Sequence, residues 1–165
     1  MENVVDVIHQ HALQVLSERG VHLDDIAQLV YDLQSDYQDE LSMQECRFHV
    51  DKVLEKREIH NAIITGIEID RLAEEGQIRS PLLEMIRNDE GLYGVDEVLA
   101  FSITNVYGSI GLTNFGYLDK LKPGILKEIN AHLRGQVNTF LDDIVAAIAA
   151  AASSRLAHNK AGTRA

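Results

Sequence analysis

The last predicted helix, residues 139–157, constrains the fold of this chain more than any other stretch. It consists largely of alanine and isoleucine, so it has no polar face that could meet water along its length. A helix that is apolar on all sides is normally surrounded by other helices, and the small alanines let neighbouring backbones approach closely. The sequence therefore predicts a compact helical bundle with this helix at its centre. The alanines concerned are Ala146, Ala147, Ala149, Ala150, Ala151 and Ala152.

Apolar residues recur at helical spacing along most of the remaining chain, which favours an all-α fold of seven or eight helices. Ser42 and Glu45 have the spacing of a capping box, so a helix is expected to begin there. The apolar pattern then continues to Gly76, too far for one typical helix, and we expect a break between Lys56 and His60. Further helices are predicted over about 3–18, 24–33, 80–88, 95–106 and 123–134.

Residues 98–118 carry no charge, and this run approaches the roughly 20 residues that span a bilayer. Polar side chains interrupt it, and Gly108, Gly111 and Gly116 are typical of a loop. We therefore predict a buried helix followed by a Gly-rich turn, and no transmembrane span.

The length of 165 residues fits one folded unit. We expect an N-terminal helical extension over residues 1–55, packed on a core of residues 56–158, and a frayed tail over 159–165. A net charge of −11 argues against broad nucleic-acid binding. The lone Cys46 and the lack of a signal-peptide pattern indicate a cytoplasmic location. Small-residue helix faces can also pack between chains, so a homo-oligomer is expected.

Acidic residues stand at three predicted helix boundaries. Asp96 and Glu97 open one helix, Asp119 precedes the stretch KLKP, and Asp142 and Asp143 open the central helix. One interpretation is that each acid stabilises its own helix through the helix dipole. The other is that the helix ends converge and the carboxylates surround one or two Mg²⁺ ions, which prefer oxygen ligands. The spacing alone leaves both interpretations open.

Three sequence blocks resemble the signature blocks of the phosphatidylglycerophosphatase A family. They are YGVDEVLAFSI (93–103), FGYLDKLKPGI (115–125) and FLDDIVAAIAA (140–150), in the family's order and approximate spacing. The resemblance covers roughly residues 59–158, and the whole chain also resembles the bacterial low-temperature-requirement C proteins. The residues that match the motifs are Asp96, Glu97, Asp119, Lys122, Pro123, Asp142 and Asp143.

The resemblance implies a Mg²⁺-dependent phosphatase that removes the terminal phosphate of phosphatidylglycerophosphate. On this hypothesis the metal stabilises the phosphate charge and lowers the pKa of a bound water, while Lys122 neutralises a phosphate oxygen. A variant is an aspartyl-phosphate route through Asp142 or Asp119. The implied metal ligands are Asp96, Glu97, Asp119, Asp142 and Asp143, and the implied catalytic residues are Asp119, Lys122, Asp142 and Asp143.

The chain also departs from the membrane-spanning members of that family. It has no apolar spans, and Ala147 stands where glycine is common. A lipid substrate would then be met through peripheral contact with a bilayer, and another phosphomonoester is the alternative substrate. The alternative function is a non-catalytic helical regulatory or scaffold protein. In that case the acids would cap separate helices instead of facing one cavity.

Overall fold

The computed structural model describes residues 4–131 and 135–162, and these fold into nine α-helices and one short 3₁₀-helix, η1. The predicted all-α class is confirmed, although the described part of the chain has one more α-helix than the predicted maximum. The elements are α1 (Val4–Glu18), α2 (Leu23–Gln34), α3 (Met43–Leu54), α4 (Arg57–Glu74), α5 (Leu82–Arg87), α6 (Val95–Thr104), η1 (Asn105–Tyr107), α7 (Ser109–Leu121), α8 (Ile125–Asn130) and α9 (Leu141–Gly162).

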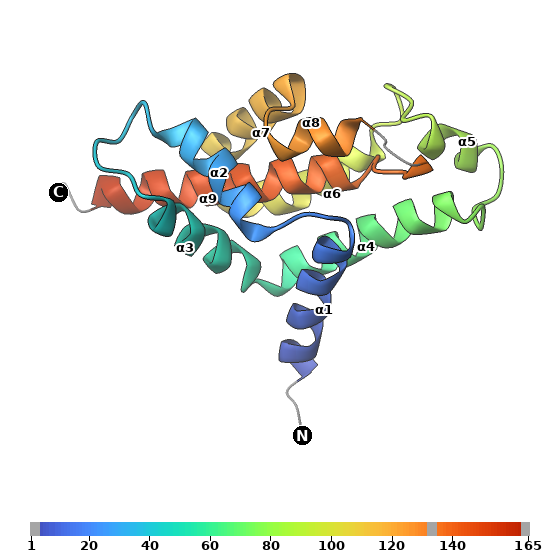
Figure 1. Cartoon of the computed structure of the whole chain (residues 1–165), viewed down its shortest axis with the longest axis horizontal. Helices are drawn as coiled ribbons and strands as arrows, with labels where there is room; N and C mark the ends of the chain where they lie inside the picture. Colours follow the sequence, from blue (N-terminus) through green and yellow to red (C-terminus); the bar gives the residue numbers. More distant parts are fainter. Residues whose placement is uncertain (1–3, 132–134, 163–165) are drawn as a thin grey trace.

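Helix α9 lies along the long axis of the molecule, with α7 and α8 on one side and α4 on the other (Figure 1). Helices α2, α3 and α6 also pack against it. Every residue from Leu141 to Ser154 is buried, as expected for a helix without a polar face. The predicted central position of this helix is therefore confirmed.

Close approach between α4 and α9 depends on Gly66. A Cβ atom at this position would lie 2.4 Å from Ile144 Cδ1 and 3.1 Å from Phe140 Cβ, both in or just before α9. Ile144 would have to move for any larger residue to fit, because a contact this short is repulsive. Glycine at this position thus sets how tightly the helix that begins at Arg57 can pack on α9.

The N-terminal helices complete the layer around α9. Helices α2 and α3 pack on each other and on α9, while α1 packs against α4. The predicted break is present but lies slightly earlier than expected, since α3 ends at Leu54 and α4 already begins at Arg57. At the start of α3 the Ser42 hydroxyl accepts the Glu45 backbone N–H at 3.1 Å, as the capping pattern predicts. The division of the chain near residue 55 stays a prediction.

Both parts of the prediction of a buried helix and a Gly-rich turn over residues 98–118 are wrong. Helix α6 is only partly buried, since Val98 is 63% exposed, and residues 109–121 form α7 where a Gly-rich turn was predicted. Only Gly108 turns the chain, with a φ of 80°. Gly111 instead faces α6, where an added Cβ would lie 3.2 Å from the Thr104 carbonyl oxygen. Packing against α9 and α6 outweighs the low helix propensity of glycine here. None of the helices described is long and apolar enough to cross a membrane.

The C-terminal end of the chain is more helical than predicted. Helix α9 continues to Gly162, so residues 159–162 of the predicted frayed tail are helical. Lys160 Nζ lies 3.3 Å from Glu45 Oε1 of α3, a contact that ties this end to the bundle. Residues 163–165 of the predicted tail lie outside the described residues.

Candidate functional site

The start of α9 is held by side chains from other helices. The buried Asp70 carboxylate of α4 accepts the backbone N–H groups of Phe140, at 3.1 and 3.2 Å, and of Leu141, at 2.9 Å. Thr139 Oγ1 donates to the Ile86 carbonyl oxygen at 2.6 Å. Burial raises the pKa of Asp70 to about 8, although both amide hydrogen bonds favour the carboxylate. The first backbone amides of α9 therefore have a partner that the helix itself does not supply.

All six predicted site residues line one small pocket of about 150 Å³. Three helices converge there: the first turn of α6, the last turn of α7 and the first turn of α9. The acids therefore face one cavity, and they do not merely cap separate helices. The lining residues from these segments are Asp96, Glu97, Asp119, Asp142 and Asp143, together with Lys122, which directly follows α7.

The loop that precedes α6 closes the pocket with residues that the motifs did not indicate. Asp89, Glu90, Gly91 and Gly94 lie in its lining. Asp89 adopts a φ of 47°, an uncommon conformation for a residue other than glycine. The sequence does contain a signal for these lining residues, because Asp89 and Glu90 are an adjacent pair of acids in a Gly-containing stretch just before Asp96.

Lys122 joins two of the converging helices. Its Nζ lies 2.8 Å from Asp119 Oδ1 and 2.6 Å from Asp142 Oδ2. Burial lowers the pKa of the Lys122 ammonium, but the Asp142 and Asp119 carboxylates outweigh this effect and the net shift is upward. Lys122 therefore stays charged and is the only cationic side chain among the residues that line the pocket. Lys120, two residues earlier, is exposed and is absent from the lining.

The carboxylates of the pocket are difficult to ionise together. Burial, followed by repulsion from Asp142, raises the pKa of Asp143 to about 10. Burial also raises the pKa of Asp142, to about 6, because the opposing effect of Lys122 offsets it only in part. The pKa values of Asp96 and Glu97 are raised as well, chiefly by burial. A divalent cation would relieve this repulsion by favouring the charged forms.

The donor set fits a hard divalent cation. Asp119, Asp142 and Asp143 each offer a carboxylate oxygen, and these oxygens lie within 4.8 Å of one another. Neither histidine nor cysteine lines the pocket, so its protein side chains offer mainly oxygen donors. Asp96 and Glu97 line the same pocket outside this close cluster. These residues could hold a metal ion with oxygen ligands.

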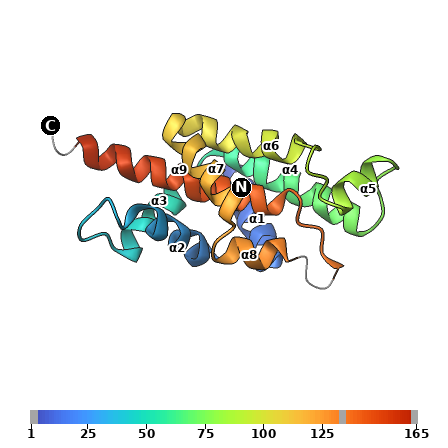
Figure 2. The same cartoon turned by 90° about the horizontal axis from the view of Figure 1, so that it is seen from above.

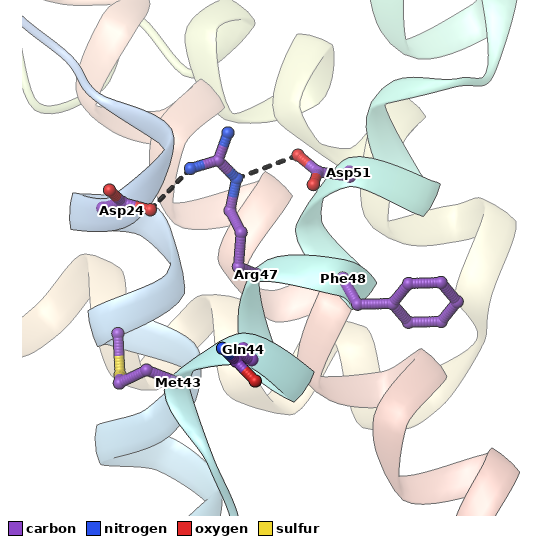
Figure 3. Close-up of a pocket in the computed structure, with 6 residues that line it drawn as sticks. All are labelled: Asp24, Met43, Gln44, Arg47, Phe48 and Asp51. Atoms are coloured by element: carbon purple, nitrogen blue, oxygen red, sulfur yellow. Dashed lines mark hydrogen bonds and ion pairs between the residues drawn. The ribbon is translucent and has the colours of Figure 1, made fainter.

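A larger depression of about 460 Å³ lies between α2 and α3 (Figure 3). Arg47 of α3 reaches both Asp24, with Nη1 at 2.5 Å, and Asp51, with Nε at 3.0 Å. Phe48 points away from Arg47 and is half exposed (Figure 3). The two carboxylates in this depression, Asp24 and Asp51, share this arginine as their partner, so most of their negative charge is balanced. We call Arg47, Asp24 and Asp51 the Arg47 cluster.

The fold and the pocket define an all-helical protein with a carboxylate-lined cavity that suits a divalent cation. The profile of the phosphatidylglycerophosphatase A family matches residues 16–158, and the chain belongs to this family. The match begins well before residue 59, where the recognisable resemblance starts, and it includes α2 and α3. The predicted family resemblance is thus confirmed.

Similar proteins are known from Bacillus subtilis and Listeria monocytogenes. The uncharacterized protein YutG of Bacillus subtilis is 61% identical over 143 residues, which are 87% of this chain and 86% of that protein. The crystal structure of low temperature requirement C protein from Listeria monocytogenes is similar, with a TM-score of 0.91 and 57% identity over 93% of this chain and 96% of that one. The crystal structure of YpjQ from B. subtilis has a TM-score of 0.93 and 48% identity over 98% of this chain and 99% of that one.

Proposed function

We propose that this chain is a Mg²⁺-dependent phosphomonoesterase and that its substrate is phosphatidylglycerophosphate. The observation that carries this proposal is the single pocket in which carboxylates from α6, α7 and α9 surround one lysine. Membership of the phosphatidylglycerophosphatase A family supports a phosphatase-like role. In this proposal the protein works in the cytoplasm and meets its lipid substrate by peripheral contact with the bilayer.

The close cluster is the proposed cation site. Asp119, Asp142 and Asp143 would hold Mg²⁺, with Asp96 as a further ligand. The cation, when bound, supplies positive charge that stabilises the phosphate group as negative charge develops during hydrolysis. Its presence would also keep Asp142 and Asp143 ionised near neutral pH, where burial otherwise favours their protonated forms.

Lys122 is the proposed phosphate-binding residue. Its ammonium lies between Asp119 and Asp142, so it is oriented toward the pocket and stays charged. A phosphate oxygen placed beside Nζ would receive a charge-assisted hydrogen bond. Two carboxylates already hold this ammonium in place, and little reorganisation is needed when the substrate binds.

Glu97 is the proposed general base. It lines the pocket outside the close three-carboxylate cluster. The residue is exposed, and partial desolvation, with repulsion from Asp119 and Asp96, raises its pKa. A carboxylate with a raised pKa is a better acceptor for the proton of the attacking water. Water oxygen then bonds to phosphorus, the phosphorus–oxygen ester bond breaks, and the glycerol oxygen leaves with the bond electrons and takes up a proton.

Phosphate release and Mg²⁺ binding test the proposal when they are measured on the same proteins. Wild type would be assayed with phosphatidylglycerophosphate in detergent micelles, and Mg²⁺ binding would be followed by calorimetry. Asp142→Asn is the test variant, since it removes the charge with little change in shape. Asp51→Asn is the matched control, because it alters a carboxylate that is paired with Arg47 outside the pocket.

We expect wild type and Asp51→Asn to bind Mg²⁺ and release phosphate, and Asp142→Asn to do neither. Mg²⁺ binding without phosphate release from the lipid would show that the substrate is wrong, and other phosphomonoesters would then be tried. A wild type that binds no Mg²⁺ would refute the metal centre. A phosphoenzyme trapped after acid quench would replace direct water attack by the aspartyl-phosphate route.

A further inference from the structure

One buried carboxylate outside the pocket contacts the helix that carries two of the pocket acids. Asp70 of α4 is completely buried, and it accepts the backbone N–H groups of Phe140 and Leu141 at the start of α9. Such amides are usually capped by a Ser, Thr, Asp or Asn side chain at the start of the same helix. A carboxylate that reaches them from another helix must first be desolvated, which costs free energy. Capping by itself therefore does not explain why a carboxylate is buried here.

The next two amides of α9 determine how Asp142 is oriented. The Asp142 amide donates to the Asn138 carbonyl oxygen at 3.2 Å. The Asp143 amide donates to Asp142 Oδ1 at 2.9 Å, and Lys122 Nζ lies 2.6 Å from Asp142 Oδ2. One oxygen of the Asp142 carboxylate is thus bonded to the helix backbone and the other to the ammonium in the pocket. A shift of this first turn therefore moves a pocket carboxylate directly.

Helix α4 contacts both helices that begin with pocket acids. It runs alongside α6, and the start of α9 packs on it as well (Figure 2). A Cβ atom added at Gly66 would meet Leu99 of α6 and Ile144 of α9, so the missing side chain lets α4 approach both helices closely. Asp70 lies four residues after Gly66 and therefore on the same face of α4. This close approach brings its carboxylate within hydrogen-bond distance of the α9 backbone.

The segment just before α9 is held by further side chains. Thr139 Oγ1 donates to the carbonyl oxygen of Ile86 in α5 at 2.6 Å. Glu74, one turn after Asp70 on α4, accepts the Val137 backbone N–H at 2.7 Å. Contacts with α4 and α5 therefore fix the chain as it enters the first turn of α9.

We infer that Asp70 is a positioning residue for the pocket: it fixes the first turn of α9 so that Asp142 and Asp143 face the other pocket residues. The inference rests on the proposed function only in requiring that this pocket binds Mg²⁺. This cation demands nearly ideal octahedral geometry, so a small displacement of the two α9 carboxylates weakens its binding. Removal of a group that holds metal ligands in place typically lowers metal affinity by about 10-fold to 100-fold.

Two buried hydroxyl groups, one at each side of the inferred effect, provide a matched comparison. Thr139 Oγ1, just before α9, donates to the Ile86 carbonyl oxygen at 2.6 Å, and Ser154 Oγ, further along α9, donates to the Tyr107 carbonyl oxygen at 2.8 Å. Thr139→Val and Ser154→Ala each remove one such donor and change no charge. Only Thr139 belongs to the segment that Asp70 holds.

Calorimetric titration of the full chain with Mg²⁺ at neutral pH tests the inference. Asp70→Ala removes the acceptor of both amides, and its Kd for Mg²⁺ is expected to be about 10-fold to 100-fold higher than that of wild type. Asp70→Asn removes the charge but keeps one oxygen acceptor, and its Kd is expected to lie closer to that of wild type than to that of Asp70→Ala. Thr139→Val should raise the Kd by a smaller factor than Asp70→Ala, and Ser154→Ala should leave it unchanged.

Two further measurements separate positioning from loss of the fold. Circular dichroism shows which variants are folded, and Thr139→Val decides the question if Asp70→Ala is not. Amide exchange in metal-free protein reports local opening of the backbone. At the start of α9 it is expected to be faster in Asp70→Ala than in wild type, and unchanged in Ser154→Ala.

Three outcomes would overturn the inference while leaving the metal centre in place. One is a folded Asp70→Ala and a folded Thr139→Val that bind Mg²⁺ as tightly as wild type. Another is a Ser154→Ala that weakens binding as much as Asp70→Ala does, since a general loss of stability would then be the cause. The third is an Asp70→Asn that binds as weakly as Asp70→Ala, because the charge of Asp70 would then matter and not the amides that it holds.

Failure of the proposed function would look different. A wild type that binds no Mg²⁺ would refute the metal centre and this inference together. Normal Mg²⁺ binding with the expected order of variants, but without phosphate release, would refute the proposed phosphatase activity and support the positioning role of Asp70.

Discussion

The Arg47 cluster and the acidic pocket contain the same small unit, one basic side chain between two aspartates. Arg47 reaches Asp24 and Asp51 at 2.5 and 3.0 Å, and Lys122 reaches Asp119 and Asp142 at 2.8 and 2.6 Å. The distances therefore do not distinguish the two regions. Their surroundings do, because the Asp24 side chain is 80% exposed and the Asp142 side chain only 5%.

This difference shows what turns an ion pair into a candidate reactive site. Water screens the exposed Arg47 cluster, and its contribution to stability is small. In the pocket, burial strengthens the charge interactions of Asp142 and Asp143, and Asp96, Glu97 and Asp143 add negative charge that Lys122 does not balance. A divalent cation can compensate that surplus. The Arg47 cluster has no comparable need for one.

Removal of one carboxylate should have the largest effect, and only in the pocket. Asp142→Asn is expected to lower the rate of phosphate release by at least about 100-fold to 1,000-fold, because it removes a proposed ligand of the cation that stabilises the phosphate charge. Asp51→Asn should leave the rate unchanged. Initial rates at a Mg²⁺ concentration that saturates wild type provide the measurement. Equal rates for the two variants would mean that the pocket does not carry the activity.

Mg²⁺ should stabilise the protein through the pocket alone. At a free Mg²⁺ concentration about 100 times its Kd, the free energy of unfolding should rise by about 2.7 kcal/mol. Asp143→Asn should lose most of this gain, while Asp24→Asn should keep it. Urea unfolding with Mg²⁺ and with EDTA tests both variants. A gain that persists in Asp143→Asn but disappears in Asp24→Asn would place the ion at the Arg47 cluster.

The pH dependence of stability should also come from the pocket. Metal-free protein should become less stable as pH rises, because the fold raises the pKa of Asp142 from 3.8 to about 6 and that of Asp143 to about 10. A carboxyl group with a raised pKa contributes stability fully below its unfolded value and loses it as pH passes the folded value. Urea unfolding between about pH 5 and about pH 9 covers most of this window.

Two comparisons separate the pocket from the rest of the chain in that experiment. Asp143→Asn should flatten the fall in stability with pH, whereas Asp51→Asn should not. Saturating Mg²⁺ should reduce the fall in wild type, since the cation favours the charged carboxylates. Stability that rises with pH in metal-free wild type would contradict the pKa shifts from which the expectation comes.

The smallest effect is expected from Arg47→Gln. The exposed ion pairs of Arg47 should contribute less than about 1 kcal/mol to the free energy of unfolding, and activity should be unchanged. Lys122→Gln is the comparison: it should cost more stability in metal-free protein and abolish most phosphate release, because buried carboxylates lose their only cationic partner in the lining. Equal losses of stability in the two variants would show that burial does not separate the two clusters.

The sequence correctly predicted those parts of the fold that are determined by residues close together along the chain. The central position of α9 follows from an apolar pattern within one helix, and the start of α3 follows from the spacing of Ser42 and Glu45. Helix α7 could not be predicted in this way. Its glycines have low helix propensity, and contacts with α6 and α9 decide that it forms.

The candidate site likewise has one part that short sequence motifs predict and another part that only helix packing determines. The sequence by itself determined which acids and which lysine match the family motifs, because these residues lie in short, recognisable blocks. Only the tertiary structure decided that they share a pocket, that Asp89 and Glu90 join them, and that Asp70 caps α9. The physical reason is chain separation: Lys122 meets Asp142 across 20 residues and Asp70 meets Leu141 across 71, and local spacing cannot predict contacts that helix packing creates.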